Sequence, residues 1–194
     1  MKSTTSIELD EQEERFSVGD IISFTLNDGE IVEALGVKND PDGMVFCAVD
    51  CLEKEYAMNA ENTNKGGYEA SDLRKALNSE IIDRFPSDIR ERLVPFDNGD
   101  LLRIPTEKEI FGKNEYGEDE PDTVTQWEPM KLRRNRIAFQ GHNGVWEWYW
   151  LQNRLRDVVS AAHFVHVYGD GNCDDDGASD AWVGVRPAFK IRYL

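Results

Sequence analysis

A stretch near the C-terminus, YGDGNCDDDGASDAW at 168–182, places carboxylate and amide side chains between glycines. Such oxygens are the ligands that Ca²⁺ prefers in proteins. An EF-hand loop that began at Asn172 would have Gly177 in the sixth place, as required, but Val183 in the twelfth, where a bidentate glutamate is needed. The pattern therefore excludes an EF-hand. We expect a solvated turn with no cofactor, and retain as the alternative a looser calcium site with the candidate ligands Asp170, Asn172, Asp174 and Asp176.

Two histidines just before this stretch, His163 and His166, are the candidate ligands for a transition metal. In a strand their spacing directs the two side chains to opposite faces, whereas a helix would bring them to the same face. The segment 150–165 fits either element by its apolar periodicity. We favour the arrangement in which one histidine is exposed and the other packs beside a tryptophan or tyrosine.

The patterns of a catalytic site are absent from the sequence. No serine stands in a nucleophile-elbow pattern, and no glycine-rich phosphate loop follows a predicted strand. Cys47, Cys51 and Cys173 lack the neighbouring ligands that zinc would need, and we predict reduced, mostly buried thiols. We therefore expect a non-enzymatic protein and keep an unrecognised hydrolase as an alternative.

Aromatic residues alternate through the short segment 146–150. In a strand, Trp146, Trp148 and Trp150 share one face while Tyr149 takes the other, and one of the two faces should fill the core. Rings that stay exposed would be contact anchors, and the polar residues around them have the composition of an adaptable recognition surface. The predicted ligand-binding surface comprises Trp148, Trp150, Gln152, Asn153, Arg154, His163, His166, Tyr168, Asp170, Asn172, Asp174, Asp176, Asp180 and Trp182.

The charge of the chain restricts its partners. Its 194 residues include 22 basic and 38 acidic side chains, for a net charge of −16. Such a chain repels nucleic acids and anionic membranes, so neither is an expected partner. Because no apolar run resembles a signal peptide or a transmembrane helix, we predict a cytoplasmic protein.

The elements expected along the chain indicate an α+β fold. Residues 1–16 are predicted to be a flexible acidic arm and 17–194 a single domain. The domain should open with an antiparallel β-meander over 19–52, followed by two short helices over 68–85 and 87–94, with Ser71 and Ser87 as N-caps. A further short helix should begin at a capping box of Thr106 and Glu109 and stop at Gly112, before a loop-rich C-terminal β half.

Five segments carry a resemblance to a known family: GDIISF, LRKALN, RIPTEKEIFGKNEYG, WEWYWLQN and GVRPAFKI, in this order. The chain resembles a bacterial domain family of unknown function, frequent in gut bacteria and their mobile elements. That family looks like a branch of the C-type-lectin-like fold, which also serves formylglycine-generating enzymes and the variable proteins of retroelements. The resemblance implies a C-type-lectin-like domain in which Gly184–Pro187 form a core strand beside Tyr149–Leu151, with display surface between them.

The function implied is recognition of a protein or carbohydrate partner through the C-terminal loops, in a bacterial or phage-associated display protein with a variable face between Trp148 and Trp182. One alternative is a degenerate enzyme of the formylglycine-generating type. Those relatives depend on two cysteines in the C-terminal half, where this chain has only Cys173, so their activity is not carried over. A structural component of a larger assembly is the remaining alternative, and the oligomeric state does not follow from the sequence.

Overall fold

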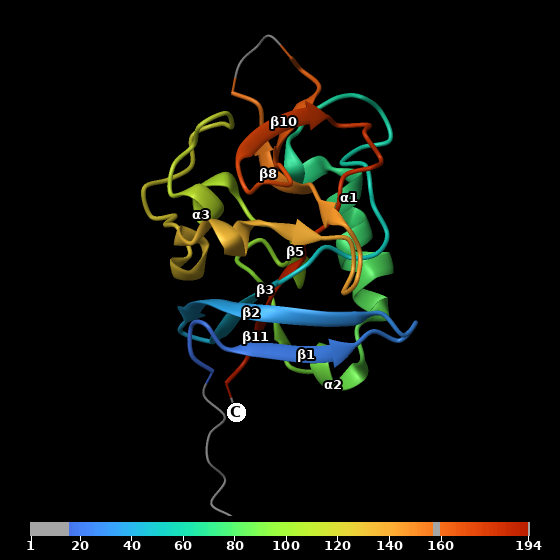
Figure 1. The fold of residues 1–194 in the computed structure, drawn as a ribbon, viewed down its shortest axis with the longest axis vertical. Coiled ribbons are helices and arrows are strands. Elements are labelled where there is room, and N and C mark those ends of the chain that lie inside the picture. The colour runs from blue at the N-terminus through green and yellow to red at the C-terminus, as the bar shows by residue number, and fades with distance from the viewer. Residues whose placement is uncertain (1–15, 157–159, 194) are drawn as a thin grey trace, which may run out of the picture.

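The computed structural model describes residues 16–156 and 160–193. Two antiparallel sheets lie one above the other along the long axis, with the N-terminal strands in the lower half of the view (Figure 1). The arrangement is α+β, as predicted. The predicted arm falls almost wholly outside the described residues, but Phe16 already packs edge to face on Phe46, with 5.1 Å between ring centroids. Within the described part of the chain, every helix is too short or too polar to cross a bilayer.

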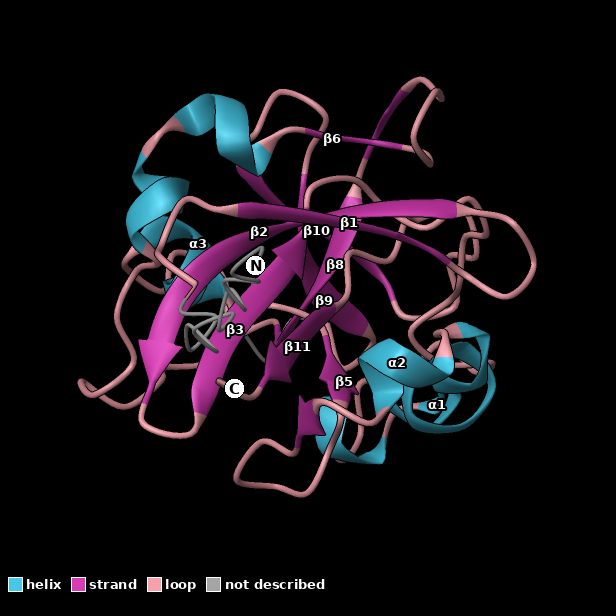
Figure 2. Ribbon diagram, turned by 90° about the horizontal axis from the view of Figure 1, so that it is seen from below, coloured by secondary structure: helices cyan, strands magenta, loops and turns pink. Residues whose placement is uncertain are grey.

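The larger sheet has six strands and is strongly curled (Figure 2). Its first three strands form the predicted meander, and the last strand of the chain returns to pair with the third. Two short strands pair with the other edge of that last strand. The strands are β1 (Ile21–Thr25), β2 (Ile31–Asp40), β3 (Gly43–Ala48), β4 (Leu93–Val94), β5 (Leu102–Arg103) and β11 (Ala188–Ile191).

The smaller sheet has three strands in the order β10-β9-β8 and is accompanied by a short hairpin. Its strands are β8 (Tyr149–Arg154), β9 (His163–Val167) and β10 (Cys173–Gly177), and the hairpin consists of β6 (Ala138–Phe139) and β7 (Trp146–Glu147). The segment 150–165, whose periodicity fitted either a helix or a strand, contributes residues to β8 and β9. Residues 157–159 of this segment lie outside the described ones. The expected solvated turn is present only in part: the chain turns at Gly171, which adopts a φ of 80°, and again at 177–180, whereas Asp174, Asp175 and Asp176 lie in β10 and pair with β9.

The helices are short and lie on two sides of the molecule (Figure 1). Ser71 caps α1 as predicted, since its side chain accepts a hydrogen bond from the Arg74 amide, whereas Pro86 caps α2 in place of Ser87. The capping box of Thr106 and Glu109 is formed as predicted. The α-helices are α1 (Asp72–Ala76), α2 (Ser87–Arg90) and α3 (Glu107–Phe111); α1 continues through helical turns at Leu77–Ile81 and Ile82–Arg84, and 3₁₀ turns occur at Tyr68–Ala70, Glu128–Lys131 and Arg133–Arg136.

Hydrophobic clusters cover both faces of the central strands. Every residue of β3 and β11 is buried, and alternate side chains enter different clusters. Phe46 and Phe189 belong to the first cluster together with Trp150. Tyr149 and Leu151, which flank Trp150 in the chain, belong to the second cluster. The expectation that only one face of the tryptophan-rich segment fills the core is therefore wrong, because β8 lies between two packed layers.

The chain between β10 and β11 joins the two sheets. Gly184 pairs with the segment leading into β8: its amide donates to the Trp148 carbonyl at 2.8 Å, and its carbonyl accepts from the Trp150 amide at 3.2 Å. The predicted proximity of Gly184–Pro187 to Tyr149–Leu151 is confirmed, although regular strand structure begins only at Ala188. A Cβ on Gly184 would lie 2.7 Å from the Trp148 carbonyl oxygen, so this close approach requires glycine.

Arg186 is the central side chain of this junction and is only 1 % exposed. Its Nε donates to the Ala48 carbonyl at 2.5 Å, and its Nη1 donates to the Asn135 carbonyl at 2.9 Å and the Tyr149 hydroxyl at 3.1 Å. Tyr149 in turn donates to the Arg136 carbonyl at 2.9 Å. One guanidinium therefore connects the end of β3, the 3₁₀ turn before β6 and the start of β8.

Replacing Arg186 with methionine should lower the free energy of unfolding by roughly 3–5 kcal/mol, because three buried acceptors lose their donor. Arg186→Lys should recover only part of this loss, since an ammonium group does not reproduce the planar fork of donors. Urea unfolding checks both variants. The control is Arg90→Met, which removes a half-exposed ion pair with Asp83 and should change stability by about 0.5 kcal/mol or less. An Arg186→Met protein as stable as the wild type would contradict this role.

Candidate functional site

Four aromatic side chains from different parts of the C-terminal half meet on one surface. Trp146 comes from β7, Trp148 from the link between β7 and β8, Tyr168 from the turn after β9, and Trp182 from the link between β10 and β11. Trp148 is central: its ring centroid lies 4.7 Å from those of both Tyr168 and Trp182 and 6.3 Å from that of Trp146. We call this group the aromatic surface.

The outer rings of the aromatic surface are exposed. Trp146 is 52 % exposed, Trp182 45 % and Tyr168 38 %, whereas Trp148 is half-buried against the first hydrophobic cluster. Phe139, which pairs with Trp146 across the β6–β7 hairpin, is also exposed. An apolar patch of this kind on an otherwise highly charged protein is typical of a contact surface.

The aromatic surface rests on a rigid base. The His166 ring stacks on Trp148, with centroids 5.3 Å apart and planes inclined by only 7°, and Trp150 meets His166 edge to face. Burial lowers the pKa of His166, so the ring is neutral at pH 7. His163 projects from the other face of β9, with Nδ1 2.6 Å from the Asp175 carboxylate. The predicted packing of one histidine beside a tryptophan is confirmed for His166, whereas His163 is half-buried and the two rings lie on opposite faces of β9.

Gly169 allows Trp146 to reach its position. A Cβ on Gly169 would lie 2.1 Å from Cε3 of the Trp146 ring, so the indole lies directly on the glycine backbone. In the sequence this glycine is indistinguishable from the turn glycine two residues later. Only the tertiary structure shows that the Trp146 ring packs on the backbone of Gly169.

A pair of carboxyl groups, Glu55 and Glu147, lies beside the tryptophans. Oε1 of Glu147 accepts the Trp148 amide at 2.8 Å, and its side chain forms a hydrogen bond with Glu55. Burial and the neighbouring carboxyl group raise the pKa of Glu147 to about 7. Sequence analysis missed both residues, because the long-range contact between them has no local signal.

A second pair, Asp176 and Asp180, lies beyond His166. Oδ2 of Asp176 is 3.9 Å from Nε2 of His166. The pKa of Asp176 is raised to about 6 by burial and by the hydrogen bond with Asp180. The predicted residues Trp148, His166, Tyr168 and Trp182 thus come together, and Asp176 and Asp180 lie next to them.

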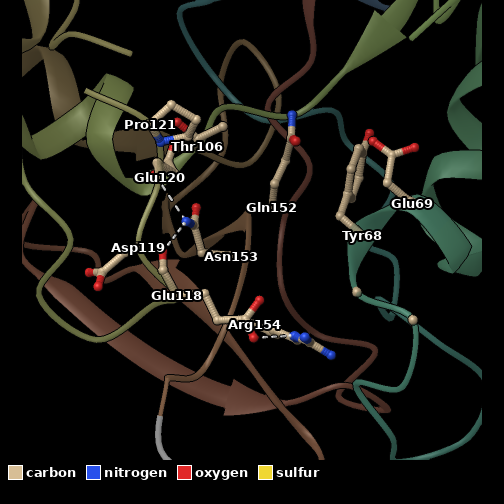
Figure 3. A pocket seen from close by; sticks show the side chains of 12 residues that line it. Tyr68, Glu69, Thr106, Glu118, Asp119, Glu120, Pro121, Gln152, Asn153 and Arg154 are labelled. Atoms are coloured by element: carbon tan, nitrogen blue, oxygen red, sulfur yellow. Dashed lines mark hydrogen bonds and ion pairs between the residues drawn. The ribbon is translucent and has the colours of Figure 1, made fainter. Parts of the chain in front are cut away.

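Other members of the predicted surface lie elsewhere. Trp150 is fully buried, so its assignment to the surface was wrong; its Nε1 donates to the Tyr56 carbonyl at 2.8 Å within the core. Gln152, Asn153 and Arg154 line a separate cavity of about 410 Å³, with Tyr68 and Glu69 on the facing wall (Figure 3).

Several polar side chains lining this cavity bond within the protein, whereas the Tyr68 hydroxyl and Oε1 of Glu120 are buried and have no hydrogen-bond partner among the described residues. Arg154 pairs with Glu118 at 2.6 Å, and Gln152 donates to the Ile104 carbonyl. Asn153 is buried and donates to Glu120 at 2.9 Å (Figure 3). The contacts of Asn153 and Arg154 hold the acidic loop 118–121 against β8, and Gln152 bonds to the segment before α3; none of the three residues lies on the aromatic surface.

The calcium candidates do not form a common site. Asp170 pairs with Arg133 at 3.0 Å and accepts from both the amide and the side chain of Asn172. Asp174 accepts the amide of its own neighbour, and Asp176 is engaged with Asp180. Across residues 16–156 and 160–193, no group of three or more His, Cys, Asp or Glu side chains is arranged to hold a metal ion.

The three thiols are free and shielded. Cys47 and Cys51 are buried, and burial raises the pKa of both. Burial raises the pKa of Cys173 as well, and the adjacent Glu107 carboxylate adds to the effect. All three are therefore protonated at neutral pH, which is unfavourable for nucleophilic or redox chemistry.

No protein-family model, curated protein or solved structure matches this chain. The geometry described above is therefore the basis for inferring its function.

Replacing Gly169 with alanine should displace the Trp146 ring, because the added methyl group occupies the position of Cε3. We expect a loss of about 1 kcal/mol in stability, since an exposed ring can move outward. In ¹H–¹⁵N NMR spectra, the Trp148 indole N–H should shift in Gly169→Ala in the same direction as in Trp146→Ala, because both changes remove the neighbouring ring. The double variant should resemble Trp146→Ala alone. An unchanged Trp148 resonance in Gly169→Ala would contradict this contact.

Replacing Glu147 with glutamine should stabilise the protein above neutral pH. An unfolded glutamate ionises near pH 4.5, whereas this folded carboxyl group keeps its proton to about pH 7. Its contribution to stability is therefore present below pH 4.5 and lost as the pH rises through that window. Glutamine mimics the protonated acid, so Glu147→Gln should gain roughly 1–3 kcal/mol at pH 8 and little at pH 4 in urea unfolding. The exposed Glu128→Gln should behave as the wild type at both values, and an equal effect of Glu147→Gln at both would refute the prediction.

Proposed function

We propose that this chain is a partner-recognition domain of the C-type-lectin-like type, and that the aromatic surface is its contact site. The observation that carries the proposal is the exposure of Trp146, Tyr168 and Trp182 on a stacked base of Trp148 and His166. Rigid aromatic rings bury a large area on binding while losing little conformational entropy, and for this reason they dominate binding energies at interfaces.

The architecture supports the same proposal. A curled sheet that includes both the first strands and the last strand carries a smaller sheet, and the β6–β7 hairpin and the segments flanking the smaller sheet present the aromatic residues. Binding residues are commonly found on loops held by a rigid scaffold. The junction at Gly184 and Arg186 fixes Trp182 relative to Trp148, which favours a preformed contact surface.

The enzymatic alternatives have weaker support. A formylglycine-type oxidation would require reactive thiols, and the three cysteines are shielded with raised pKa values. A hydrolase would require a histidine or a paired acid and base in a cavity, but the cavity beside Gln152 has no histidine among its lining residues, and its carboxylates Glu118 and Asp119 pair with Arg154 and Arg156.

The proposal is tested by selecting ligands on the immobilised protein, from a random peptide display library and on a glycan array. We expect selected ligands to lose at least about tenfold in affinity for the double variant Trp146→Ala/Trp182→Ala, because two exposed rings are removed without altering charge. Tyr116→Ala and Leu132→Ala remove exposed apolar side chains elsewhere and are the matched controls. Selection of ligands that bind all variants equally, or of none, would refute the aromatic surface as a recognition site.

A further inference from the structure

We propose that the aromatic surface recognises a segment of a partner protein that carries lysine or arginine, with the cationic side chain placed on the exposed indole and phenol rings. This inference rests on the proposed function and specifies the chemistry of the partner. It follows from three features of the surface: the orientation of the rings, the carboxyl pairs beside them, and the charge of the neighbouring segment.

The rings offer faces in several orientations around one centre. Trp182 is inclined by 69° to Trp148, whereas Trp146 is nearly parallel to Trp148 at 21° and Tyr168 is tilted by 35°. An aromatic face carries partial negative charge and attracts an ammonium or guanidinium group, and tryptophan is the strongest such ring. A cationic side chain with an apolar stem can contact one ring along the stem and another with the charged group.

Two carboxyl pairs lie near Trp148, one through its chain neighbour Glu147 and the other through the histidine that stacks on it. Glu147 is the chain neighbour of Trp148 and bonds to its amide, while Asp176 lies 3.9 Å from the histidine that stacks beneath Trp148. In each pair the second carboxyl group, from Glu55 or Asp180, is close enough to share a hydrogen bond. Two such groups cannot both ionise without repulsion, and a nearby cation relieves that repulsion. A cationic partner is therefore favoured over a neutral or anionic one.

The negative charge around the aromatic surface also favours a cationic partner, and it acts over a longer range than the carboxyl pairs. The segment 168–182 contains five aspartates and no lysine or arginine, in a chain with a net charge of −16. Arg133 neutralises only Asp170 of this group. A field of this sign accelerates the approach of basic segments and disfavours acidic ones.

The test uses a synthetic Gly-Ser peptide of about 12 residues with lysine at every third position, and the same peptide with every lysine acetylated. By calorimetric titration, the lysine peptide should bind the wild-type protein at least about tenfold more tightly than the acetylated peptide. Trp146→Ala/Trp182→Ala should reduce the affinity of the lysine peptide by about tenfold or more, although the net charge is unchanged. Tyr116→Ala should leave it unchanged.

Three outcomes would overturn the inference: equal binding of both peptides, no binding of the lysine peptide, or affinity for the lysine peptide that survives removal of both indoles. The last outcome would indicate attraction by net charge alone. If the ligand selection described above instead yields sugars or neutral peptides that depend on Trp146 and Trp182, the proposed function stands and this inference fails. If no ligand depends on the two rings, both fail.

Discussion

The structure depends on one buried cation, the guanidinium of Arg186. A charge in the protein interior is costly unless hydrogen bonds replace the water it has lost. Here those bonds go to the carbonyls of Ala48 and Asn135 and to the Tyr149 hydroxyl, which belong to three segments far apart in sequence. The same guanidinium also lies over the Tyr149 ring, with Cζ 5.2 Å from its centroid. Desolvation of the guanidinium is thus offset only when the two sheets are in register, and this requirement couples them.

This junction also determines what the surface can present. Gly184 lies two residues before Arg186 and hydrogen-bonds to Trp148 and Trp150, and these bonds fix the position of the nearby Trp182. His166 stacks on Trp148 and contacts the buried Trp150, so the packed core extends without a break to the aromatic surface. The exposed rings therefore stand on an ordered base, and binding through them would require little rearrangement.

Near the aromatic surface, carboxyl groups are both partly buried and close to one another, and both conditions disfavour their ionised form. The chain carries a large excess of carboxylates, and the fold brings some of them together at Glu55/Glu147 and Asp176/Asp180 instead of dispersing them. Elsewhere a buried carboxylate is compensated by donors: Glu107 accepts hydrogen bonds from the backbone amides of Glu115, Tyr116 and Gly117 and so holds their loop in place. The two carboxyl pairs beside the tryptophans lack such a set of donors, and this difference motivates the inference of a cationic partner.

The sequence by itself determined the local elements, because their causes are local. The meander follows from the β-rich segments within 19–52, the start of α1 from Ser71, and α3 from the capping box of Thr106 and Glu109. The orientation of His163 and His166 was left open by the sequence, because their segment fitted a helix or a strand; their place on β9 sets them on opposite faces.

Only the tertiary structure decided which of the candidates share a surface. Trp150, predicted to be a contact residue, is buried because β8 is covered on both faces, and Trp182 joins Trp148 because the last segment crosses between the sheets. The contacts of Glu55 with Glu147 and of Gly169 with Trp146 likewise join residues far apart in the sequence and depend on tertiary packing. Periodicity specifies the face of a strand on which a side chain lies, but what covers that face is set by long-range packing.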